Sequence, residues 1–149
     1  MSQLKVVSKT PWRPDHAEDM IFACSDSRFR DHIDEMTNGH LDIEAADTIA
    51  IPGGPVCLTS SYAGSEIFRA QARLLIELHN IRRVIGISHD NCGWYQSTYS
   101  DQTENFIKEI QQCHLREFEL AILEINPELQ VLRFFAQPEN GTVHFYPVT

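Results

Sequence analysis

The stretch of sequence that decides the fold is residues 20–28, MIFACSDSR. Its first four residues are apolar, and a short apolar run of this kind fits a strand buried in a sheet. The run ends at Cys24, and a polar stretch follows it. We therefore predict a buried strand over residues 20–23 whose carboxyl end leads directly into Cys24, Asp26 and Arg28.

Strands and helices alternate along the rest of the chain. The further predicted strands cover residues 48–51, 83–88, 129–135 and 142–147. The predicted helices cover residues 27–38, 65–80 and 101–126. Asn140-Gly141 indicates a tight hairpin before the last strand, and Asp101 with Glu104 resembles a capping box at the start of the last helix. The middle helix is expected to bury one face, formed by Ile67, Ala70, Leu74, Leu75 and Leu78.

This alternation predicts an α/β fold. We expect a single domain with a mainly parallel sheet of about five strands, helices on both faces, and one antiparallel strand added by the final hairpin. A chain of 149 residues suits one domain with one core. Residues 1–19 show no clear period and are interpreted as an N-terminal arm, which leaves residues 20–149 for the domain.

Charge and composition limit the partners. The formal net charge is −9, which repels phosphate backbones and argues against nucleic acid and against anionic membranes. No apolar segment is long enough to span a bilayer, and residues 1–14 lack the apolar core of a signal peptide. We therefore expect a cytoplasmic protein, in which the four cysteines are reduced, catalytic or metal-bound.

Two short motifs carry residues suited to metal chemistry: residues 24–28, CSDSR, and residues 89–93, HDNCG. Thiolate and imidazole are good zinc ligands, and His89 and Cys92 are spaced to chelate from one loop. Cys24 follows a different strand of the same predicted sheet. Because ligands of parallel sheets bind beyond the carboxyl ends of the strands, both motifs should open onto one crevice. Three protein ligands with a fourth position open is a catalytic arrangement of zinc.

The two motifs together resemble the β-class carbonic anhydrases, in which Cys-x-Asp-x-Arg is followed by His-x-x-Cys. The resemblance extends over residues 20–147, including the closing hairpin. It implies one Zn²⁺ per chain, bound by Cys24, His89 and Cys92. It also implies a subunit that forms a homodimer or a larger homo-oligomer.

The resemblance further implies a catalytic pair beside the metal. Arg28 would hold the carboxylate of Asp26 away from the zinc and so leave the fourth position to water, because a guanidinium fork fits a carboxylate well. The implied reaction is the zinc-dependent, reversible hydration of carbon dioxide to bicarbonate, with Asp26 and Arg28 as catalytic residues.

Two positions depart from the family. Residues 52–55 are Pro-Gly-Gly-Pro, where many members carry Arg-Asn-Ala-Gly, and Ser88 stands where glycine is usual. The glycines still allow the backbone to bend toward the metal. The departures leave two alternatives open: a related zinc hydrolase of carbon disulfide or carbonyl sulfide, and a zinc-binding member without catalytic activity.

The same residues also fit other kinds of site. Residues 24–30 also fit the Cys-x5-Arg loop of cysteine phosphatases, but this loop lacks glycine and Asp26 would repel phosphate. Cys24 alone fits a buried core cysteine, and Asp26 with Arg28 fits a helix cap with a surface ion pair. Aromatic residues after the metal motif could line the site mouth, meet a second subunit or pack in the core; they are Trp94, Tyr95 and Tyr99. His114 follows Cys113 on a predicted helix, where neighbouring residues face different directions, and the other histidines are expected at the surface.

Overall fold

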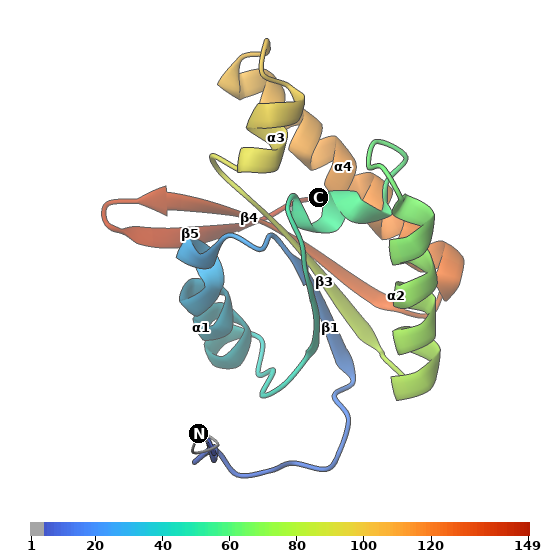
Figure 1. Ribbon diagram of the computed structural model, residues 1–149. Helices are drawn as coiled ribbons and strands as arrows, with labels where there is room; N and C mark the ends of the chain where they lie inside the picture. The colour runs from blue at the N-terminus through green and yellow to red at the C-terminus, as the bar shows by residue number, and fades with distance from the viewer. Residues whose placement is uncertain (1–4) are drawn as a thin grey trace.

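A five-stranded sheet with the strand order β2-β1-β3-β4-β5 forms the centre of the molecule (Figure 1). The computed structural model describes residues 5–149. The strands are β1 (Asp19–Ala23), β2 (Asp47–Ala50), β3 (Arg83–His89), β4 (Gln130–Glu139) and β5 (Thr142–Pro147). The first four strands pair in parallel, and β5 pairs antiparallel to β4. The predicted α/β fold with a closing antiparallel strand is confirmed.

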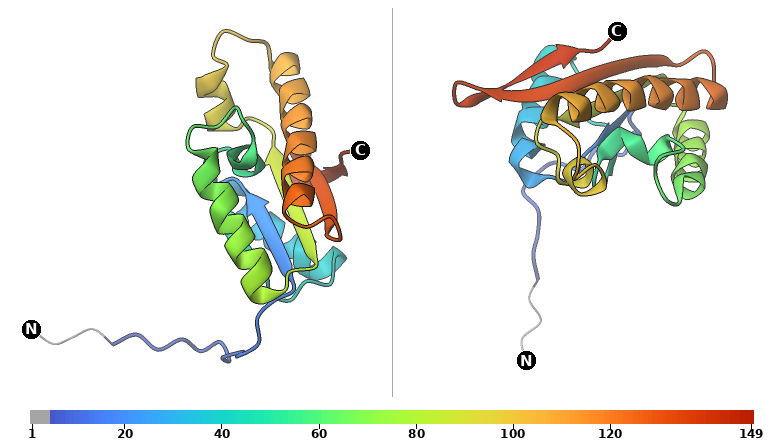
Figure 2. Two further views of the ribbon diagram at one scale, coloured as in Figure 1. Left: turned by 90° about the vertical axis from the view of Figure 1, so that its right-hand side faces the viewer. Right: turned by 90° about the horizontal axis from the view of Figure 1, so that it is seen from above.

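Helices cover both faces of this sheet (Figure 2). The helical elements are η1 (Ser27–Phe29), α1 (Arg30–His40), η2 (Gly54–Leu58), α2 (Ser65–His79), α3 (Gly93–Thr98) and α4 (Glu104–Ile125). On one face α1 packs against Ile21 and Ile85, and on the other α2, α4 and η2 pack against Phe22 and Val84. The alternation of side chains along each strand thus produces two separate apolar cores.

The register of the central strands brings the two sequence motifs together. Ala23, the last residue of β1, is paired with Ile87 of β3. The chain therefore leaves β1 at Cys24 beside the point where β3 reaches His89. On the face of the sheet that α2 and α4 cover, α4 packs so closely that a Cβ on Gly86 would lie 2.5 Å from the ring of Phe118.

The prediction of the buried face of α2 was wrong for most of its residues, although Leu75 packs against the core as expected. Ile67, Leu74 and Leu78 are 64%, 53% and 64% exposed, whereas Ala72 and Ile76 are buried. The helix carries apolar residues on both sides, and both sets satisfy a helical period. The side with Ala72 and Ile76 packs against the sheet and α4. The exposed residues Ile67, Leu74 and Leu78 form an apolar stripe on the surface.

Element boundaries differ from the prediction at several places. The last helix begins at Glu104 with Thr103 as its N-cap, since the Thr103 side chain accepts a hydrogen bond from the Phe106 amide, so the capping box at Asp101 was wrong. Helix α1 continues through Gly39 to His40. Helices α3 and η2 were not predicted. The hairpin was predicted correctly: Asn140 and Gly141 both have positive φ, as a two-residue type I′ turn requires.

The segment before β1 contains no helix or strand over residues 5–18. It leads away from the body of the molecule in Figure 2. Its contacts with the body include a stack of His16 on His79 with ring centroids 3.9 Å apart. The first part of the proposed arm, residues 1–4, lies outside the described residues. Across residues 5–149, none of the helices combines the length and the apolar character needed to cross a membrane.

Candidate metal centre

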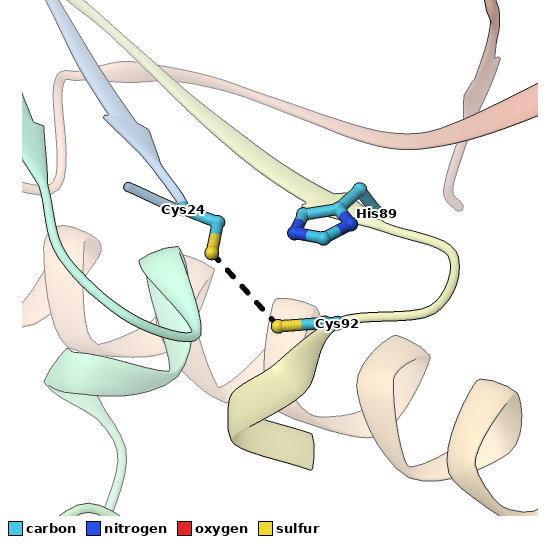
Figure 3. Close-up of side chains that lie close together, drawn as sticks. All are labelled: Cys24, His89 and Cys92. Atoms are coloured by element: carbon cyan, nitrogen blue, oxygen red, sulfur yellow. Dashed lines mark hydrogen bonds between the residues drawn. The ribbon is translucent and has the colours of Figure 1, made fainter. Parts of the chain in front are cut away.

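Three potential metal ligands come from three different structural positions and converge on one point (Figure 3). Cys24 is the first residue after β1, His89 is the last residue of β3, and Cys92 is the N-cap of α3. Between the last two the chain reverses through Asn91, whose φ is +56°, in the left-handed region that asparagine tolerates better than most residues. This turn allows a strand and a helix to present ligands to the same space.

The distances within this cluster suit a tetrahedral metal. One ligand atom from each of Cys24, His89 and Cys92 lies within 4.8 Å of the others. The two sulfur atoms are 3.9 Å apart. Two thiolates bound at about 2.3 Å to a tetrahedral zinc would be separated by about 3.8 Å. The sulfur pair is therefore already at the spacing that zinc would impose.

The imidazole of His89 is held in the orientation that a metal requires. Its Nδ1 lies 2.7 Å from the carbonyl oxygen of Asp90. Because a carbonyl can only accept, Nδ1 donates and Nε2 of the neutral ring carries a free lone pair. Nε2 is buried and has no hydrogen-bond partner among the described residues. A buried acceptor of this kind needs a partner, and a metal ion beside the two sulfurs would satisfy it.

The electrostatics of the two thiols also favour metal binding. The hydrogen bond from Cys92 lowers the pKa of Cys24, with further lowering from His89 and from the backbone amides of Gly53 and Asp26, against the opposing effect of burial. The same sulfur–sulfur contact, together with burial, raises the pKa of Cys92. Cys24 thus forms a thiolate readily. A bound cation would displace the proton of Cys92 and stabilise the second thiolate.

Asp26 lies beside this cluster and is tied to Arg28. Oδ1 accepts from the Arg28 Nε at 3.0 Å, and Oδ2 accepts from Nη2 at 2.6 Å. This hydrogen bonding lowers the pKa of Asp26 to about 2. The Asp26 Oδ2 is 3.9 Å from the His89 Nε2. The five residues predicted from the two motifs are therefore brought together, with the carboxylate turned toward the guanidinium.

A cavity of about 210 Å³ opens beside Cys24 and Asp26. Its wall has an apolar part formed by Ile21, Ala23, Ile33 and Ala50, and a polar part that includes Ser25, Arg30 and Thr48. It borders the cluster on the side that carries Cys24 and the carboxylate of Asp26. Arg30 pairs with Asp34, at 3.2 Å between Nε and Oδ2. In the phosphatase-like interpretation set aside above, Arg30 would belong to the cysteine loop, whereas its guanidinium here pairs with Asp34 of the same helix.

Two buried polar residues of α4 support the cluster and were missed by sequence reasoning. Gln111 Nε2 donates to the carbonyl oxygen of His89 at 2.8 Å. His114 is 2% exposed. Its Nδ1 lies 2.9 Å from the hydroxyl of Tyr95 and its Nε2 lies 3.1 Å from the hydroxyl of Ser61. Burial lowers the pKa of His114 to about 4.

A signal for these two residues exists in the sequence. Gln111 and His114 stand on the same helical stripe as Phe118 and Ile122, which were assigned to the core. Polar residues on a buried stripe require partners, so their positions alone mark them as supports for a neighbouring element.

Solved structures with the same architecture identify the fold. A carbonic anhydrase from Streptococcus mutans superposes with a TM-score of 0.58 at 15% identity, covering 94% of this chain and 87% of that one. A β-carbonic anhydrase from Trichomonas vaginalis gives 0.57 at 12% identity, covering 96% and 87%. This chain has the β-carbonic anhydrase fold. A tetrameric β-carbonic anhydrase from Sordaria macrospora also matches, with a TM-score of 0.57 at 14% identity over 88% of this chain and 81% of that one.

Sequence relatives add no activity to this likeness in fold. An uncharacterised protein of Rickettsia conorii is 27% identical over 139 residues, covering 89% of this chain and 74% of the relative. An uncharacterised protein of Rickettsia bellii is 26% identical over 125 residues, covering 79% of this chain and 75% of the relative. No protein-family model matches the sequence.

Proposed function

We propose that this chain binds one Zn²⁺ through Cys24, His89 and Cys92 and catalyses the reversible hydration of carbon dioxide to bicarbonate. The observation that carries the proposal is the convergence of two sulfurs at 3.9 Å and a buried imidazole nitrogen that has no hydrogen-bond partner within residues 5–149. The β-carbonic anhydrase fold and the paired carboxylate beside the cluster support it.

Each residue has a role that follows from its contacts. Zinc bound at this cluster supplies a Lewis acid that brings the pKa of water to about 7. The Asp90 carbonyl fixes the ring of His89 through Nδ1, as supporting groups commonly do for metal-binding histidines. Asp26 is an ionised hydrogen-bond acceptor at the edge of the site, and Arg28 keeps it from turning toward the ligands. The cavity beside them admits a small uncharged molecule.

The test combines metal analysis with kinetics on the same samples. We expect one zinc per chain and carbon dioxide hydration in stopped flow at about pH 8.5, above the pKa of zinc-activated water. Cys92→Ser should lose most of the zinc and the activity. Cys113→Ser is the matched control, because Cys113 is exposed on α4 and lies outside the cluster. Full zinc retention in Cys92→Ser would contradict the ligand assignment.

A second candidate reaction is hydrolysis of carbon disulfide or carbonyl sulfide at the same zinc. The observation that favours it is the loop of residues 52–55, Pro-Gly-Gly-Pro, which presents no polar side chain beside Cys24. Sulfide release from either substrate by zinc-loaded protein that does not hydrate carbon dioxide would select it. Zinc-loaded protein inactive on all three substrates would indicate a zinc-binding protein without this catalysis.

Assembly and location extend the proposal. We propose a homodimer or larger homo-oligomer, which the tetrameric Sordaria macrospora structure supports by likeness of fold. Light scattering on the purified chain tests this directly, and a monomer at micromolar concentration would contradict it. The interpretation of residues 1–19 as an arm and the cytoplasmic location stay predictions.

A further inference from the structure

We propose that Trp94 and Tyr62 are positioning residues that hold the loop of residues 52–55 between the two cysteine-bearing segments of the metal centre. The backbone of this loop then lies between Cys24 and the start of α3 and sets the distance between them. This inference rests on the proposed function only in treating Cys24 and Cys92 as ligands of one metal ion.

The first observation is a pair of aromatic rings that joins α3 to the loop. Trp94 stands two residues after Cys92, and its indole stacks on the ring of Tyr62 with centroids 5.3 Å apart and an interplanar angle of 24°. The hydroxyl of Tyr62 donates to the carbonyl oxygen of Pro52 at 3.1 Å. The ring pair therefore links the segment that carries Cys92 to the first residue of the loop.

The second observation is the absence of space around Gly53 and Gly54 within the described residues. A Cβ on Gly53 would lie 3.1 Å from Cδ2 of Trp94 and 2.6 Å from Cγ1 of Val56. A Cβ on Gly54 would lie 2.7 Å from the backbone nitrogen of Cys24. One glycine thus lies against the indole, and the next lies against the backbone of the other cysteine.

These contacts make the Pro-Gly-Gly-Pro sequence a geometric requirement of this chain. Both glycines have positive φ, +84° at Gly53 and +59° at Gly54, so the backbone can turn through the narrow gap. A Cβ at Gly53 would force Val56 to shift and would press on the indole of Trp94, and so on the N-terminal end of α3 where Cys92 is the cap. Loss of the indole would leave the loop held at one side only.

The experiment measures Co²⁺ binding to the metal-free full chain by visible absorption, with Zn²⁺ competition for affinity. Cobalt reports ligand geometry through its spectrum independently of any activity. Trp94→Ala and Gly53→Ala should each weaken binding about tenfold or more, as loss of groups that support metal ligands commonly does. Trp94→Phe, which keeps an aromatic face for Tyr62, should restore most of the affinity.

Two comparisons separate the positioning role from general damage. Gly141→Ala is the control for Gly53→Ala, because Gly141 has a similar φ of +82° with no atom within 4 Å of an added Cβ. Trp12→Ala is the control for the other tryptophan, which is 88% exposed. Both controls should bind cobalt like the parent protein. In the double variant Gly53→Ala/Trp94→Ala the loss of affinity should be smaller than the product of the two single-variant losses, since the contact of the added Cβ with the indole is absent and only the contact with Val56 remains.

A milder variant keeps the test decisive if Trp94→Ala does not fold. Tyr62→Phe removes only the hydroxyl that reaches Pro52, and it should weaken cobalt binding several-fold while circular dichroism stays unchanged. Unchanged affinity and spectrum in Tyr62→Phe and in folded Gly53→Ala would overturn the inference. A parent protein that binds neither Co²⁺ nor Zn²⁺ would instead overturn the proposed function.

Discussion

The side chain of Gln111 donates a hydrogen bond to the backbone carbonyl of His89 at 2.8 Å, although the two residues are 22 positions apart. Helix α4 therefore holds the strand end that carries a proposed metal ligand. Gln111 is 1% exposed, so neither partner of this bond has access to bulk water. Its loss would leave a buried carbonyl without a partner.

We expect Gln111→Ala to lower the free energy of unfolding by about 1–3 kcal/mol, the usual penalty for an unsatisfied buried polar group. Urea unfolding of the metal-free protein measures it without interference from bound zinc. Gln112→Ala is the matched control, because its side chain is on the exposed side of the same helix and should change stability by less than about 0.5 kcal/mol. Equal values for the two variants would contradict the role of Gln111.

Arg28→Ala is expected to separate metal binding from catalysis. Without the guanidinium, the pKa of Asp26 returns toward its ordinary value and the carboxylate is free to turn toward the zinc. We therefore expect zinc content close to that of the parent and at least about a tenfold loss of carbon dioxide hydration. Arg73→Ala, on an exposed face of α2, should leave both quantities unchanged. Undiminished hydration in Arg28→Ala would remove the pair from the mechanism.

The sequence was sufficient to predict that Cys24, His89 and Cys92 lie close together, because these residues follow two strand ends of one parallel sheet. The apolar run before Cys24 and the strand before His89 predict buried neighbours, and the register of Ala23 against Ile87 then brings the motifs together. The place of each of these side chains follows from its position next to a strand end, so their convergence did not depend on predicting how distant helices pack.

The parts that were missed depend on packing between distant segments. Helix α2 has two apolar sides. The side that contains Ile76 is the buried one because α4 packs against it. Helix α3 spans Gly93–Thr98, which is too short to show a hydrophobic period. The burial of His114 was not predicted, because it depends on partners from two other segments of the chain, Tyr95 and Ser61.

The burial of His114 predicts a pH-dependent loss of stability. Its pKa is lowered to about 4 in the folded chain, below the ordinary value of 6.5. As the pH falls below about 6.5, the unfolded chain takes up this proton first, so the folded state loses stability until the pH approaches 4. Between pH 7 and pH 5 this group should cost about 1–2 kcal/mol of unfolding free energy.

His114→Gln removes this proton and should flatten the stability profile between pH 7 and pH 5, while lowering stability at pH 7. Guanidinium unfolding at a series of pH values measures both effects. His40→Gln, at an exposed position near the end of α1, is the control and should keep the parent profile. The same slope in His114→Gln as in the parent would assign the acid sensitivity to other groups.

The exposed stripe on α2 predicts opposite outcomes for two neighbouring apolar residues. Leu74 is 53% exposed and Ile76 is 3% exposed. Ile76→Ala should destabilise the fold by about 2–5 kcal/mol, because it leaves a cavity between α2, α4 and the sheet. Leu74→Ala should change the stability of an isolated subunit by less than about 0.5 kcal/mol. Thermal unfolding followed across a protein dilution series compares them, since a loss in Leu74→Ala that appears only at high concentration would place the stripe in a contact between subunits. A large, concentration-independent loss in Leu74→Ala would show that the stripe packs within the chain and would overturn the observed orientation of α2.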